Sequence, residues 1–166
     1  MPASSRPRRS VLYMPGSNAR ALEKGWSLAA DGLILDFEDA VATESKVEAR
    51  KLVGDALAEG GYGMREILVR TNGLETEWGQ GDIAAVAAMP ADGVLLPKVE
   101  SADMVRKAEA ILDACGARPE MAIWCMIETP LGVLNVKEIA SATPRLGGFV
   151  MGTSDLAKDL HCLHTP

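Results

Sequence analysis

Six short apolar runs recur along the chain, and segments with helical spacing of apolar residues separate them. The runs cover residues 10–14, 32–36, 66–70, 93–97, 121–127 and 148–151. We expect helices to begin after residue 18 and to cover residues 44–57, 83–88, 102–114, 133–140 and 155–160. Continuous apolar strands that alternate with helices are typical of a parallel sheet covered on both faces. The sequence therefore predicts an α/β fold of six βα units.

Composition limits the class of protein. A chain of 166 residues with 48% hydrophobic residues can fill one domain core. The net charge of -6 argues against a nucleic-acid partner, because no basic face could neutralise many phosphates. Three widely spaced cysteines without a CxxC pair predict neither a disulfide framework nor a zinc knuckle, and they favour the reduced cytoplasm. No stretch reaches the length of a membrane span, and we interpret residues 1–9 as a flexible basic arm.

Charged side chains follow nearly every predicted strand, at the edge where parallel α/β folds gather ligands. The strand at 121–127 runs directly into Glu128, and the run at 147–152 opens onto Asp155. An ionised carboxylate is costly at the end of a buried strand without a partner, so the pair suggests a shared cation. Any one of these residues could instead be an N-cap or a solvated rim charge.

The carboxylates of Asp36, Glu38, Glu128 and Asp155 are hard oxygen donors with no histidine or cysteine at a strand end beside them. This set suits Mg²⁺ or Mn²⁺ and does not suit zinc. Because Mg²⁺ takes one or two carboxylates and keeps several waters, Glu128 and Asp155 could bind it directly while the other two hold waters. Arg70 would face this cluster and could grip a substrate carboxylate or a developing oxyanion. A salt bridge from Arg70 to Asp36 or Glu38 is the alternative, and the two roles can coexist.

Three further features have competing interpretations. Lys98 could form a Schiff base, although an ion pair with a nearby carboxylate is the simpler reading. The turn at 15–18 leads into a helix with Arg20 and Lys24, which fits either an anion site or a plain N-capped turn. The histidines and cysteine at 161–164 resemble metal ligands, but we interpret them as a tail.

Six segments carry a family resemblance in order over nearly the whole chain: RSVLYMPGSNARALEK, GLILDFEDAV, ILVRTNG, LLPKVES, MIETPLGVLN and FVMGTSDLAKDL. They resemble the HpcH/HpaI aldolase and citrate lyase beta subunit family, in the group of citrate lyase beta and malyl-CoA or citramalyl-CoA lyases. The resemblance implies a TIM barrel that assembles as a homotrimer or hexamer. Since such a barrel has eight units, we expect residues 10–166 to form a partial barrel, truncated before its C-terminal units.

The resemblance also implies roles for individual residues at the carboxyl edge of the strands. Glu128 and Asp155 would bind Mg²⁺, and Arg70 and Glu128 would contact the substrate. Asp36 and Glu38 would lie behind the metal and, with Arg70, complete the catalytic set.

The implied reaction is Mg²⁺-dependent cleavage or formation of a carbon–carbon bond in a 3-hydroxyacyl thioester such as malyl-CoA, citramalyl-CoA or a citryl thioester. Cleavage would release an acetyl thioester and a 2-oxo acid. Tyr13, Arg20 and Lys24 match the stretch that contacts coenzyme A, although the carrier could also be an acyl carrier protein. Two hypotheses stay open: an active lyase, or an inactive metal- or thioester-binding remnant that assembles with a full-length subunit.

Overall fold

A single parallel sheet organises the computed structural model, which describes residues 6–163. Its strands follow chain order, and each pairs with the next one in the sequence. They are β1 (Val11–Pro15), β2 (Gly32–Asp36), β3 (Glu66–Arg70), β4 (Gly93–Leu96), β5 (Ala122–Ile127) and β6 (Leu146–Met151). The predicted α/β fold with six strands is confirmed, because every predicted run overlaps one of these strands.

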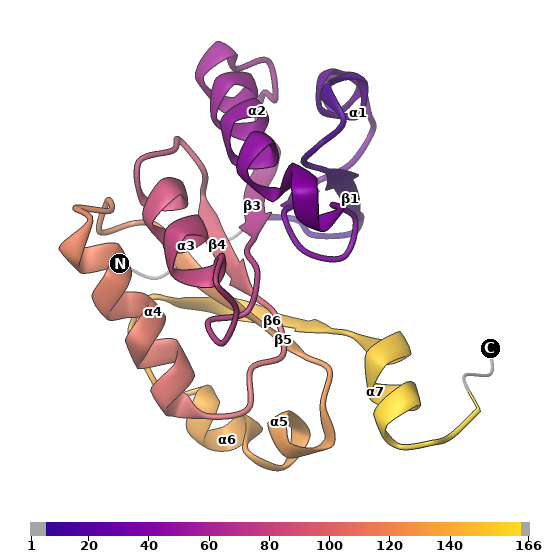
Figure 1. Ribbon diagram of the computed structural model, residues 1–166, viewed down its shortest axis with the longest axis vertical. Helices are drawn as coiled ribbons and strands as arrows, with labels where there is room; N and C mark the ends of the chain where they lie inside the picture. Colours follow the sequence, from indigo (N-terminus) through magenta and orange to yellow (C-terminus); the bar gives the residue numbers. More distant parts are fainter. Residues whose placement is uncertain (1–5, 164–166) are drawn as a thin grey trace.

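Helices connect the strands, and Figure 1 shows α2, α3 and α4 following one another along one face of the sheet. The connecting elements are α1 (Ala19–Lys24), η1 (Thr43–Ser45), α2 (Lys46–Glu59), α3 (Gly79–Ala87), α4 (Ala102–Ala114), α5 (Pro130–Leu134), α6 (Val136–Ile139) and α7 (Thr153–Asp159). Side chains cap several of them, since Asn18 accepts from the Ala21 N–H and Ser101 accepts from the Met104 N–H. Within residues 6–163, no helix is long and apolar enough to cross a membrane.

The helix predicted over residues 133–140 was wrong in its bounds and its continuity. The structure has two short helices there, and the first begins at Pro130 because Thr129 caps it and proline suits the first helical position. Asn135 separates the two helices, and its side chain donates to the Glu100 carbonyl at 2.8 Å. The helix predicted over 83–88 begins earlier, at Gly79, whose N–H donates to the Thr76 hydroxyl at 3.2 Å.

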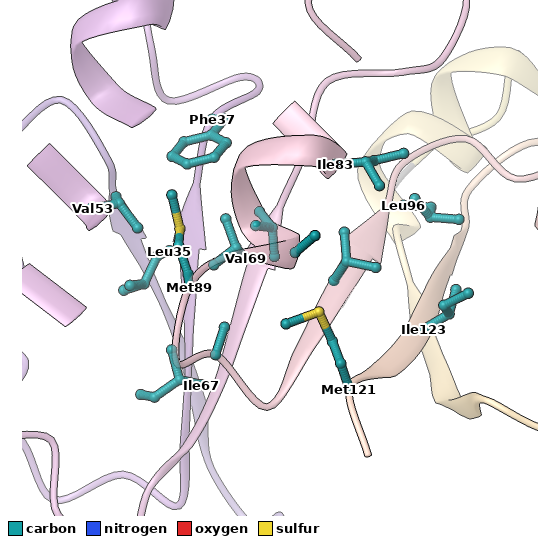
Figure 2. Packing of buried hydrophobic residues seen from close by; sticks show 14 of the residues in the cluster. Leu35, Phe37, Val53, Ile67, Val69, Ile83, Met89, Leu96, Met121 and Ile123 are labelled. Carbon is teal, nitrogen blue, oxygen red and sulfur yellow. The ribbon is translucent and has the colours of Figure 1, made fainter. Parts of the chain in front are cut away.

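The four inner strands, β2 to β5, are buried throughout, whereas most residues of the edge strands β1 and β6 are partly or fully exposed. Because successive side chains of a strand point to opposite faces, the inner strands contribute to a core on each side of the sheet. On the helix-covered face Leu35, Val69 and Ile123 pack with Val53 of α2 and Ile83 of α3, as Figure 2 shows. On the opposite face a smaller cluster lies over the inner strands. It consists of Ile34, Leu68, Leu95, Ala122, Trp124 and Met126. Burial on both faces explains why these strands appear in the sequence as continuous apolar runs.

The predicted flexible arm, residues 1–9, lies partly outside the described residues. In its described part, Arg8 forms an ion pair with Glu66 at 2.5 Å, and its guanidinium lies 4.9 Å from the Trp124 ring centroid. Arg9 forms an ion pair with Asp31 at 2.7 Å. These contacts fasten the residues just before β1 to the amino-terminal side of the sheet.

Strand register brings the first site residues together. Pro15 of β1 is paired with Asp36 of β2, and Asp36 is paired with Arg70 of β3. The last residues of three neighbouring strands therefore lie side by side at the carboxyl edge. This is the edge at which the sequence predicts a site.

Candidate active site

A doubly hydrogen-bonded ion pair between Arg70 and Asp36 forms the centre of the site. Arg70 Nε lies 2.6 Å from Asp36 Oδ1, and Arg70 Nη2 lies 2.7 Å from Asp36 Oδ2. Asp36 is fully buried and also accepts from the Glu38 and Ala40 backbone N–H groups at 2.9 and 3.0 Å. Burial disfavours the charged guanidinium, but the bonds to Asp36 outweigh it and raise the pKa of Arg70. The guanidinium therefore stays charged, and the two bonds to Asp36 fix its plane.

Glu38 lies between the two cations of the site. Its Oε1 is 2.6 Å from Lys98 Nζ, and its Oε2 is 2.8 Å from Arg70 Nη1. The second contact is an ion pair without hydrogen-bond alignment, so the buried Oε2 accepts no hydrogen bond from residues 6–163. Burial raises the pKa of Glu38, and Lys98 and Arg70 oppose that rise. Asp39 also approaches Arg70 Nη1, at 3.3 Å, from an exposed position.

Glu128 follows β5 and is almost completely buried. Its Oε1 accepts from the Lys98 backbone N–H at 2.8 Å. Lys98 adopts a left-handed backbone with φ of 48°, which few residues other than glycine adopt. Burial raises the pKa of Glu128, and the negative charges of Glu38 and Asp155 add to that rise. The backbone N–H and the charge of Lys98 oppose that rise without overcoming it.

Asp155 approaches Glu128 from the next strand along the sheet. It is half-buried in the first turn of α7, which follows β6 and lies apart from α2, α3 and α4 in Figure 1. Its charge is close enough to raise the pKa of Glu128. The structure therefore places both predicted metal ligands at one edge of the sheet.

The charges of this edge do not balance. Among the described residues, three cations, Arg70, Lys98 and the buried Lys46, accompany five carboxylates at this edge, those of Asp36, Glu38, Asp39, Glu128 and Asp155. Among residues 6–163, no group of three or more histidine, cysteine, aspartate or glutamate side chains is arranged to hold a metal ion. Two protein carboxylates with waters in the other positions are, however, the usual environment of Mg²⁺.

The three residues expected to contact coenzyme A do not lie together. Tyr13 belongs to the centre of the site, because the Arg70 guanidinium lies 5.2 Å from its ring centroid and its hydroxyl lies 3.9 Å from Met126 Sδ. Arg20 and Lys24 lie one helical turn apart on the exposed surface of α1. Only Tyr13 is therefore in contact with the charged cluster.

Lys98 belongs to the charged cluster, whereas the described residues of the predicted tail and Cys125 lie away from it. Lys98 forms an ion pair with Glu38, as the simpler of its two interpretations predicted. Cys162 and His161 are exposed beyond α7, and His164 lies outside the described residues. Cys125 is buried on the helix-covered face, where burial raises the pKa of its thiol to about 12 and suppresses its reactivity.

Two contributors to the site were not predicted. Gly152 packs so closely on Glu128 that a methyl group there would collide with the Glu128 side chain. Lys46 supports the segment after β2 from behind, by bonds to its backbone carbonyls. Neither has a signal in the sequence, because a glycine before a helix and a lysine at a helix start are both common.

These charged residues lie at the carboxyl edge of a parallel sheet whose strands follow chain order, which is the place of the active site in TIM-barrel enzymes. The chain belongs to the HpcH/HpaI aldolase/citrate lyase family, whose model matches residues 9–166. The resemblance inferred from the sequence is thus confirmed.

Among curated relatives, the chain is 52% identical over 160 residues to a protein of Cereibacter sphaeroides named (3S)-malyl-CoA thioesterase, covering 96% of this chain and 54% of that one. It is 38% identical over 167 residues to the citrate lyase subunit beta of Escherichia coli, covering 98% and 55%. The chain spans about half the length of the curated relatives it matches.

Among solved structures, the CitE protein of Mycobacterium tuberculosis in complex with magnesium, acetoacetate and coenzyme A is similar, with a TM-score of 0.76 and 28% identity over 96% of this chain and 55% of that one. RipC from Yersinia pestis is similar with a TM-score of 0.72 and 31% identity over 95% of this chain and 63% of that one.

Proposed function

We propose that this edge of the sheet is a Mg²⁺-dependent site that cleaves the carbon–carbon bond of a 3-hydroxyacyl-CoA thioester of the malyl-CoA type. The products are an acetyl thioester and a 2-oxo acid. The observation that carries the proposal is the buried Arg70–Asp36 pair beside the coupled carboxylates Glu128 and Asp155. The relatives named for citrate lyase and malyl-CoA support the class of substrate.

Glu128 and Asp155 would hold the Mg²⁺ ion. Their fit rests on the excess of negative charge, the purely oxygen donor set and the raised pKa of Glu128. Mg²⁺, when bound, supplies a Lewis acid that polarises the substrate oxygen. Glu38 Oε2 forms an ion pair with Arg70 but accepts no hydrogen bond from the described residues, and a water on the metal would supply one.

Arg70 would bind the substrate through Nη1, the guanidinium nitrogen that Asp36 does not hold. Asp36 bonds Nε and Nη2, whereas Nη1 lies 2.8 Å from Glu38 Oε2 and 3.3 Å from the exposed Asp39 carboxylate. A substrate carboxylate can replace Asp39 there without breaking the buried pair. A base takes the hydroxyl proton, the hydroxyl carbon becomes the carbonyl of the 2-oxo acid, and the electrons of the broken carbon–carbon bond form the enolate of the acetyl thioester. Return of a proton from the protonated base to the enolate carbon would complete the acetyl thioester. The fixed positive charge of Arg70 favours the developing negative charge on oxygen.

Thioester hydrolysis is the second candidate, because the relatives with 52% and 48% identity are named malyl-CoA thioesterases. The same charged groups would bind the substrate, and water would attack the thioester carbonyl. An acyl-cysteine route through Cys125 has no support, because that thiol is buried with a pKa of about 12. Hydrolysis would therefore be a direct attack by water.

Product analysis separates the two reactions. We expect purified protein given (3S)-malyl-CoA and MgCl₂ to release acetyl-CoA and glyoxylate, which chromatography and mass spectrometry identify. Free coenzyme A with malate would support hydrolysis instead. Unchanged malyl-CoA would contradict both reactions and favour a binding role without turnover.

Replacing Gly152 by alanine is expected to weaken Mg²⁺ binding by about tenfold or more, the usual effect of disturbing groups around a metal ligand. The added methyl group would displace the Glu128 side chain, although the φ of -89° at Gly152 suits alanine. Isothermal titration with MgCl₂ measures the affinity. Gly54→Ala in α2 is the matched control, because its methyl group would meet only Met89 at 3.5 Å. Equal Mg²⁺ affinities of the two variants would contradict the assignment of Glu128.

A further inference from the structure

Lys46 is a buried lysine whose ammonium group donates hydrogen bonds to backbone carbonyls of the site. It is 7% exposed at the start of α2. Its Nζ donates to the Phe37 carbonyl at 2.9 Å and to the Glu38 carbonyl at 2.8 Å, and it lies 5.7 Å from the Trp78 ring centroid. Burying an ammonium group is costly unless hydrogen bonds compensate it. The lysine therefore acts on the segment that carries Glu38.

Asn72 supports the same segment from the end of β3. Its Nδ2 donates to the Phe37 carbonyl at 3.1 Å and to Asp82 Oδ2 at 2.7 Å. Asp82, fully buried in α3, is held in turn by Arg50 at 2.5 Å. A continuous polar network thus connects α2, α3 and β3 behind the site.

The opposite side of this segment carries the charges of the site. Asp36 accepts from the Glu38 and Ala40 N–H groups, and the Glu38 carboxylate extends to Arg70 and Lys98. Lys98 joins Glu38 to Glu128, because its Nζ lies 2.6 Å from Glu38 Oε1 and its backbone N–H donates to Glu128 Oε1 at 2.8 Å. The main chain at residues 37–38 therefore lies between Lys46 and Asn72 on one side and the carboxylates of the site on the other.

We propose that Lys46 is a positioning residue of the Mg²⁺ site: by holding the Phe37 and Glu38 carbonyls, it keeps the Glu38 carboxylate beside Glu128. This inference rests on the proposed function, since it presumes that Glu128 binds the metal. Lys46 itself touches neither metal nor substrate in this role.

The sign of the effect separates positioning from a plain charge effect. Removing a positive charge near a cation site makes the local potential more negative, so a purely electrostatic role predicts tighter Mg²⁺ binding in Lys46→Met. Loss of positioning predicts weaker binding, because Glu38 would no longer face the metal waters. Lys46→Arg keeps both the charge and the donors.

The test is a double-mutant cycle on Mg²⁺ affinity, measured by isothermal titration well below the melting temperature of each variant. We expect Glu38→Gln to weaken binding about tenfold, and Lys46→Met about fivefold, within or near the range for groups behind a metal ligand. The double variant should bind no more weakly than Glu38→Gln alone. Lys46→Arg should bind within about twofold of the original protein. Lys51→Met, on the exposed face of the same helix, is the matched control and should change nothing.

Each outcome decides between the alternatives. Tighter binding by Lys46→Met would overturn the proposal in favour of a charge effect, and additive losses in the double variant would overturn it in favour of a general structural role. If Lys46→Met does not fold, Lys46→Gln, which keeps one donor group, takes its place in the cycle. If Glu128→Gln binds Mg²⁺ as the original protein does, the proposed metal site fails and the role of Lys46 falls with it.

Discussion

Replacing Arg70 by methionine is expected to lower the free energy of unfolding by about 3–5 kcal/mol, the cost of leaving one member of a buried ion pair without its partner. Asp36 is fully buried and would lose two hydrogen bonds of 2.6 and 2.7 Å, keeping only those from backbone N–H groups. Urea denaturation followed by circular dichroism measures the change. The same variant should release no product from malyl-CoA.

A second substitution tests whether Asp36 is the source of this loss. In Arg70→Met combined with Asp36→Asn, the remaining side chain is neutral. Its one carbonyl oxygen can accept from either the Glu38 or the Ala40 N–H, which bond different oxygens of Asp36 in the original protein. The double variant should therefore be more stable than Arg70→Met alone, by about 1 kcal/mol or more. Arg70→Lys keeps the charge but not the planar fork, and should recover only part of the stability. A loss below about 1 kcal/mol in Arg70→Met would contradict the buried pair as a major source of stability.

The fold was predictable because the four inner strands are buried on both faces and therefore appear in the sequence as unbroken apolar runs. The charged edge was predictable for a related reason, since parallel strands end together and their next residues must share one edge. The sequence left two readings for Arg70, a salt bridge or a substrate contact. Strand register accounts for the salt bridge, because Asp36 and Arg70 are paired at the ends of β2 and β3. The second stays a proposal, for which Nη1 is available because Asp36 holds only Nε and Nη2.

The rest depends on contacts between residues distant in sequence. Lys98 bonds Glu128 through its backbone N–H, thirty residues away, and a left-handed φ at a lysine has no sequence signal. Lys46 resembles any charged residue at a helix start until the fold turns it toward the Phe37 carbonyl. Asn135 divides a segment whose apolar spacing indicates one helix, because its side chain caps a distant carbonyl instead. In each case a tertiary hydrogen bond overrides local pattern.

Replacing Glu128 by glutamine is expected to make the protein more stable than the original without Mg²⁺ at neutral pH, and less stable with it. The folded state raises the pKa of Glu128 above its ordinary value of 4.5, chiefly by burial. The stability tied to its protonated form is fully present below pH 4.5 and is lost as pH rises through the higher folded pKa. Glutamine stays neutral throughout and can still accept the Lys98 N–H bond. The advantage of Glu128→Gln should therefore grow from pH 4 to pH 7.5, within about that window.

Mg²⁺ should reverse this order, since only the original protein offers the carboxylate. A ligand at a hundred times its dissociation constant stabilises the folded state by about 2.7 kcal/mol, and Glu128→Gln should gain little of this. Urea denaturation at pH 4 and pH 7.5, with and without MgCl₂, measures the free energy of unfolding of each protein under four conditions. Glu59→Gln, on the exposed end of α2, is the matched control. Equal stabilisation of the original protein and Glu128→Gln by Mg²⁺ would show that the metal binds elsewhere. The order of stability reverses because the Glu128 carboxylate destabilises the folded protein without Mg²⁺ and binds the ion when Mg²⁺ is present.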